Sequence, residues 1–89
     1  MGKAARWIPV KLPQKLKQIR EDLELSQDGM LSRLGYGEAD GLFRSSISAY
    51  ENGKREPPLE VLLAYARAAN VAVESLIDDQ LELSQPKNM

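Results

Sequence analysis

The chain has 89 residues, of which 43% are hydrophobic and 28% charged, a length and balance that predict one compact domain rather than two domains or a disordered chain. Cys and His are both absent, which excludes disulfides, thiolate or imidazole catalysis and the usual zinc ligands, so neither a metal nor another cofactor is expected. The net charge of −1 is unevenly distributed along the chain. Residues 1–55 carry ten Lys and Arg against seven Asp and Glu, whereas residues 56–89 carry two Lys and Arg against six Asp and Glu.

The N-terminal segment 1–11 contains no helical period and is predicted to be an extended arm. The first helix should begin near Pro13, because the first turn of a helix tolerates a residue without an N–H group. Apolar residues then recur at intervals of four, three and four, at Leu12, Leu16, Ile19 and Leu23. This spacing predicts an amphipathic helix with Lys15 and Arg20 flanking its buried stripe.

A second, short helix is predicted from Ser26, whose hydroxyl can accept a bond from a first-turn amide, to Gly35, a typical residue after a helix end. Residues 36–41 are polar and glycine-rich and are predicted to form a loop. A third helix should cover about 45–52, with inner positions at Phe43, Ile47 and Tyr50.

A fourth helix follows Pro57-Pro58 and is predicted to end near Asn70. Its expected apolar stripe comprises Leu59, Leu62, Leu63, Ala66 and Ala69. A short fifth helix is predicted around residues 73–77, and the acidic segment 79–89 is predicted to be a frayed tail. The sequence therefore indicates an all-α domain of five helices.

Two helices joined by a turn occur in many helical bundles, so periodicity alone leaves a plain bundle open. Three segments are more specific: Leu25-Ser26-Gln27, Leu34-Gly35, and the run from Ile47 through Glu51-Asn52-Gly53-Lys54-Arg55 to Pro57. In combination they resemble the lambda-repressor-like (XRE/Cro-type) helix-turn-helix family of transcriptional regulators over residues 12–78. The resemblance implies a compact DNA-binding domain that reads two half-sites of double-stranded DNA as a homodimer.

The resemblance also implies individual roles in DNA binding. The residue matching Gln27 contacts a phosphate at the start of the first motif helix. The recognition helix, about 44–52, would enter the major groove, and Arg44 is the candidate for a paired contact to guanine. The full implied set is Gln27, Arg44, Ser45, Ser48, Ala49, Asn52, Lys54 and Arg55, of which the last three belong to a turn beside the DNA backbone.

The family resemblance further implies a buried ion pair between Arg20 in the first helix and Glu51 at the end of the recognition helix. This pair would be structural, because it fixes the angle of the recognition helix against the rest of the domain. We predict that the two side chains are bonded.

The sequence departs from the family pattern in three places. Twelve residue steps separate Gly35 from Ile47 where the family has about six, so residues 36–41 are interpreted as an insertion at the elbow of the motif. Leu31 stands where the family prefers alanine. The outer face of the recognition helix offers two serines and an alanine beside one arginine, so base discrimination is expected to be modest or to use loop or arm residues.

A second function of another class is open at this point. An antitoxin or other protein-interaction module could use the same fold and contact a partner protein through the acidic C-terminal end. An enzyme is not expected, because the sequence offers no catalytic constellation or phosphate-binding loop. The sequence also has no secretory signal or long apolar run, which predicts a cytoplasmic protein without membrane contact.

Overall fold

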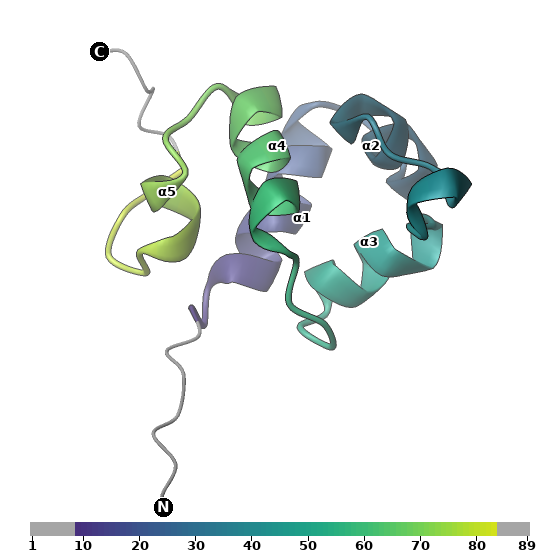
Figure 1. The fold of residues 1–89 in the computed structure, drawn as a ribbon. Coiled ribbons are helices and arrows are strands. Elements are labelled where there is room, and N and C mark those ends of the chain that lie inside the picture. Colours follow the sequence, from purple (N-terminus) through teal and green to yellow (C-terminus); the bar gives the residue numbers. More distant parts are fainter. Residues whose placement is uncertain (1–8, 84–89) are drawn as a thin grey trace, which may run out of the picture.

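The structure, a computed structural model, describes residues 9–83, which form five α-helices and one 3-10 turn and contain no strand. Their bounds are α1 Leu12–Asp22, α2 Gln27–Leu34, η1 Glu38–Asp40, α3 Arg44–Glu51, α4 Leu59–Ala69 and α5 Glu74–Ile77. In Figure 1, α2 and α3 lie together on one side of α1 and α4, and α5 lies on the opposite side. The predicted all-α class is confirmed, whereas most of the predicted arm, residues 1–8, lies outside the described residues. In the described part of the chain, no helix is long and apolar enough to cross a membrane.

The predicted helix ends are confirmed where a local cap defines them. The Ser26 hydroxyl accepts a hydrogen bond from the Gly29 amide at 2.9 Å, and α2 begins at the next residue. Gly35 then ends α2 with a φ of +88°, a conformation that costs glycine little. Asn70 ends α4 in the same left-handed region, with a φ of +59°.

One hydrophobic core joins all five α-helices. Its members are buried apolar side chains: Leu12, Leu16, Ile19, Met30, Leu31, Leu34, Ile47, Tyr50, Val61, Leu62, Tyr65, Ala66, Val71 and Leu76. Leu31, which departs from the family's alanine, is among them. The apolar stripe predicted for the first helix is confirmed at its first three positions, and Leu23 is only partly buried.

The predicted apolar stripe of α4 is partly wrong. Leu59 is 74% exposed and Leu63 is also exposed, whereas Val61 and Tyr65 are buried beside Leu62 and Ala66. Nearly every residue of α4 is apolar, so periodicity does not define which face is turned inward. Packing against α1 and α2 makes that choice.

The prediction of an inner position for Phe43 is also wrong, because its side chain is 47% exposed. Its four-residue spacing from Ile47 would place both on one face only if Phe43 were helical. Instead α3 begins at Arg44, and Phe43 has extended backbone with φ −137° and ψ 172°. The side chain therefore points away from the stripe that Ile47 and Tyr50 form.

The inserted segment is an exposed excursion with anchored ends. Tyr36 and Leu42 are half-buried and pack against the core, while residues 38–41 between them are exposed. The Gly37 amide donates to the Asp40 carboxylate at 3.0 Å, which closes the 3-10 turn η1. The segment thus has more local order than the predicted loop, although the core does not include its tip.

A bonded pair joins α1 to the end of α3, as predicted. Arg20 Nε donates to Glu51 Oε2 at 2.7 Å, and Arg20 Nη2 donates to Glu51 Oε1 at 3.0 Å. The side chains of Arg20 and Glu51 are only 16% and 3% exposed. The hydrogen bond to Glu51 raises the pKa of Arg20. This pair fixes the C-terminal end of α3 against α1.

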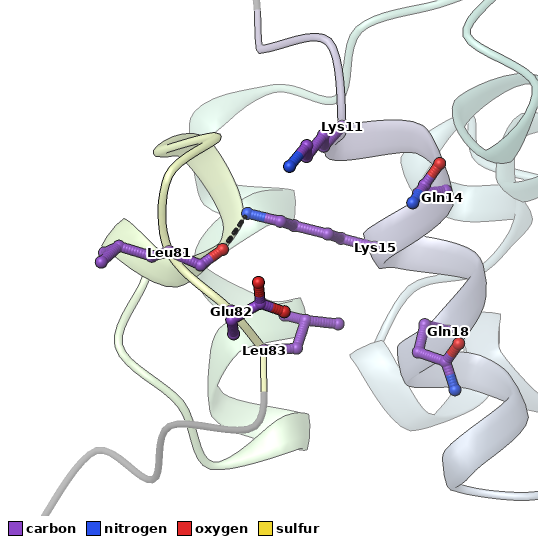
Figure 2. Close-up of a pocket in the computed structure, with 7 residues that line it drawn as sticks. All are labelled: Lys11, Gln14, Lys15, Gln18, Leu81, Glu82 and Leu83. Atoms are coloured by element: carbon purple, nitrogen blue, oxygen red, sulfur yellow. Dashed lines mark hydrogen bonds between the residues drawn. The ribbon is translucent and has the colours of Figure 1, made fainter.

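A second long-range link, which the sequence analysis missed, joins α1 to the segment after α5. The Lys15 ammonium is buried and donates to the backbone carbonyl oxygens of Ser75 at 2.6 Å, Asp78 at 3.0 Å and Leu81 at 3.0 Å. All three of its donors are thereby used. Figure 2 shows Lys15 extending from α1 toward the Leu81 carbonyl.

The same segment supplies the cap that α1 lacks. Lys11, which precedes α1, makes no side-chain cap, and the two oxygens of Asp79 accept hydrogen bonds from the Val10 and Lys11 amides, both at 3.0 Å. We call Lys15 and Asp79, with their backbone partners, the terminal latch. Residues 79–83 therefore pack on α1, which corrects the prediction of a frayed tail for this part of it. The rest of the predicted tail, residues 84–89, lies outside the described residues.

Loss of one member of the Arg20–Glu51 pair should destabilise the fold strongly. Arg20→Ala leaves the Glu51 carboxylate buried without its cation, and breaking a buried pair in this way costs about 3–5 kcal/mol. We expect a comparable loss for Glu51→Ala. Lys17→Ala, which removes an exposed cation from the same helix, is the matched control. Chemical unfolding measures all three, and wild-type stability of both pair variants would contradict the structural role.

The latch predicts an acid-dependent contribution to stability. The hydrogen bonds from the Lys11 and Val10 amides lower the pKa of Asp79. A carboxyl whose pKa is lowered by folding stabilises the protein above its unfolded pKa of about 4, and that contribution is lost as the pH falls through the lowered folded pKa. Asp79→Ala should therefore unfold at a lower temperature than wild type at pH 7, and the difference should disappear in acid.

Thermal unfolding followed by circular dichroism between pH 7 and pH 3 measures this difference. Glu82→Ala, in the same segment, is the control, because Glu82 is exposed. A temperature gap for Asp79→Ala that persists unchanged to pH 3 would show that its carboxylate does not act in the way the latch requires.

Candidate nucleic-acid interface

The candidate surface is the outward face of α3. The inward face of α3 consists of its buried residues, Ser46, Ile47, Tyr50 and Glu51. The predicted positions Arg44, Ser45, Ser48 and Ala49 lie on the other side, the first two exposed and the last two half-buried. Because inner and outer residues alternate at helical spacing, α3 has one face committed to the core and one available for contact.

The start of α3 is held by a bond that the sequence analysis did not identify. Phe43 has no capping side chain, but the Ser46 hydroxyl accepts a hydrogen bond from the Phe43 amide at 3.1 Å. Ser46 is buried, so this bond is fixed within the domain. In the usual reciprocal arrangement, the side chain of each of these two residues bonds the backbone amide of the other. Here only the Ser46 side chain does so.

The turn after α3 carries the two predicted cations. Gly53 adopts a φ of +74°, and the Lys54 and Arg55 amides both donate to the Ala49 carbonyl, at 2.9 and 3.3 Å. Both side chains are exposed, and the Arg55 guanidinium lies 6.0 Å from the centre of the Tyr50 ring. The turn therefore places two cations directly beside the C-terminal end of α3.

Asn52, the third predicted residue of this turn, is exposed at the end of α3. Its side-chain amide donates to the Ser48 hydroxyl at 3.3 Å. The bond joins two of the predicted contact residues on adjacent turns of the helix. Both retain further donors and acceptors with which to contact a ligand.

Gln27 differs from the other predicted contact residues because its side chain is bonded to the buried ion pair. It is the first residue of α2 and is half-buried, and its amide donates to Glu51 Oε1 at 3.4 Å. The same carboxylate binds Arg20. Gln27 is therefore connected to the ion pair that positions α3, and its long, weak bond leaves it able to turn outward.

Asp28 is an acid beside this surface whose role the sequence analysis did not consider. Its carboxylate lies in the first turn of α2, 4.0 Å from Nη1 of Arg44, and both side chains are about two-thirds exposed or more. An exposed pair at this distance contributes little to stability. The proximity nevertheless brings a negative charge next to the side chain predicted to contact a base.

No group of three Asp or Glu side chains among residues 9–83 is arranged to hold a metal ion.

Known proteins share this sequence pattern and this arrangement of helices. A model of the helix-turn-helix domain family matches residues 14–80. Among solved structures, the crystal structure of the P22 c2 repressor in complex with a synthetic operator is similar, with a TM-score of 0.63 and 22% sequence identity. That match covers 76% of this chain and 94% of the repressor chain, and at this identity it shows the fold alone. Among curated proteins no relative matches. The chain belongs to the helix-turn-helix domain family and has the lambda-repressor-like fold.

Proposed function

We propose that the protein binds specific sites in double-stranded DNA and regulates transcription, with the outer face of α3 in the major groove. The observation that carries the proposal is the division of α3 between a buried face fixed by Glu51 and an exposed face that begins with Arg44. A helix that reads bases must be both rigidly held and unobstructed. The structural neighbour crystallised with an operator supports the same use of this fold.

Each predicted residue has a proposed part in this interface. Arg44 would pair with the major-groove edge of guanine, and Ser45, Ser48 and Ala49 would contact bases or the adjacent backbone. Gln27, at the start of α2, and the turn residues Asn52, Lys54 and Arg55 would contact phosphates and so position the domain without reading sequence. This function requires no catalytic group or metal.

The alternative of a protein-interaction module receives less support from the C-terminal end. Asp79, one of its acids, accepts bonds from two backbone amides of the domain itself. The carbonyls of Asp78 and Leu81 are bonded to Lys15. The Asp79 carboxylate and the backbone of this end therefore hold the fold, whereas the side chains of Asp78, Leu81 and Glu82 are exposed.

Selection of bound sequences from random duplex DNA tests the proposed function directly. The purified protein should enrich a defined motif, and a homodimer should enrich a palindrome whose half-sites lie about one helical turn apart. The selected site then serves as the substrate for quantitative binding. Failure of the wild-type protein to enrich any duplex at modest salt would refute the proposal.

Arg44 and Lys54 should behave differently on the selected site. Arg44→Ala should reduce affinity by about 1–3 kcal/mol and relax preference at one base pair in each half-site, because a paired guanine contact is lost. Lys54→Ala should weaken binding to all sequences alike and reduce the slope of log K against log salt by about one unit. Fluorescence anisotropy titrations at several salt concentrations separate the two effects. Lys17→Ala, on exposed α1 surface, is the control, and identical behaviour of Arg44→Ala and wild type would remove Arg44 from the interface.

Asp28 should oppose DNA binding. Its carboxylate lies beside Arg44 and, in the proposed complex, near phosphates, so Asp28→Asn should raise affinity for any duplex by about threefold at low salt. The gain should shrink as salt increases, because exposed charges are screened. Glu74→Gln, in α5 on the opposite side of the domain, is the matched control (Figure 1). An unchanged or reduced affinity of Asp28→Asn would contradict the proposal that the start of α2 lies beside the DNA phosphates.

A further inference from the structure

Phe43 occupies a position that stability alone would give to another residue. It immediately precedes the first residue of α3, where Ser, Thr, Asp or Asn normally caps the helix, and it provides no cap. Its large apolar side chain is also 47% exposed rather than packed in the core. A residue that departs from two local rules at once is more often explained by function than by folding.

The surroundings of Phe43 indicate which function this is. Arg44 and Ser45 follow it directly and are both exposed on the face proposed to enter the major groove. In helix-turn-helix proteins the N-terminal residues of the recognition helix contact the edges of the bases. The bond from the Phe43 amide to buried Ser46 fixes the backbone here, so the ring is presented from a defined point.

An aromatic ring in the major groove has one alkyl group as a partner among the base edges. Apart from single C–H groups, the other bases expose hydrogen-bond donors and acceptors there, whereas thymine carries a C5-methyl group. We propose that Phe43 contacts the C5-methyl group of thymine and makes the protein prefer thymine beside the base that Arg44 reads. This inference rests on the proposed function and assigns a specificity to one more residue of the same surface.

The distribution of exposed apolar side chains favours a contact of Phe43 with DNA over a contact with a partner protein. The other exposed large apolar residues in the described part of the chain are Val10, Leu59, Leu63 and Leu81, and all lie outside α2, η1 and α3. Stable protein interfaces have a contiguous buried core of apolar and aromatic residues. A lone ring beside an exposed arginine better suits a single methyl group.

The test combines one change in the protein with one change in the DNA. Phe43→Ser removes the ring and introduces a favoured capping residue, so the variant should fold at least as stably as wild type, which a thermal melt verifies. Each thymine of the selected site is replaced in turn by deoxyuridine, which lacks only the methyl group. Leu59→Ser is the matched control, because it removes an exposed apolar side chain from α4.

At one position or more in each half-site, the uracil substitution should weaken wild-type binding about fourfold, the factor expected for one methyl group removed from an apolar contact. Phe43→Ser should bind the thymine site at least about fourfold more weakly than wild type and should not distinguish thymine from uracil there. Leu59→Ser should retain the full thymine preference.

Two results would overturn the inference while leaving the proposed function intact. One is wild-type binding to the selected site that is insensitive to uracil at every position. The other is a Phe43→Ser variant with wild-type affinity and an undiminished thymine preference. If the wild-type protein selects no duplex DNA at all, the proposed function fails and this inference fails with it.

Discussion

The Glu51 carboxylate lies almost entirely out of solvent at the end of α3, and it is stabilised there by two hydrogen bonds from Arg20 of α1. The third donor group of the same guanidinium, Nη1, binds the Leu25 carbonyl at 3.0 Å, just before α2. One cation thus joins α1, the connection to α2 and the end of α3. A buried carboxylate without its partner is costly, so the position of α3 is strongly constrained.

The constraint on α3 has a functional consequence because it acts on the inner side only. Glu51 shares the buried face with Ile47 and Tyr50, and at the start of α3 a buried residue, Ser46, accepts the hydrogen bond from the Phe43 amide. The outer face can therefore change its side chains without altering the angle of the helix. This separation lets one fold present many different outer surfaces.

The terminal latch performs a related task on the opposite side of the domain. Lys15 bonds carbonyls at and beyond the end of α5, where helix geometry leaves carbonyl oxygens without partners, and Asp79 bonds the amides that precede α1. Each member supplies an interaction that the other segment lacks. Two short segments that would be weakly held by their own sequences are joined in this way.

The local sequence was sufficient to predict the helix ends at Ser26, Gly35 and Asn70, because a cap or a left-handed residue depends on neighbours within a few positions. The Arg20–Glu51 pair was predicted only because the sequence resembles a family, since nothing in the spacing of the two residues indicates contact. The chemical type of the exposed α3 residues also follows from the sequence. Their role in DNA binding remains a proposal.

Other features were decided by the tertiary structure. The sequence places Lys15 only beside the buried stripe of the first helix, and its burial depends on carbonyls 60 or more residues away. The inner face of α4 could not be chosen from a helix that is apolar on nearly all sides, because packing against α1 and α2 selects it. Local physics determines where helices start and stop, whereas burial depends on which surfaces meet, and this is decided only in the folded chain.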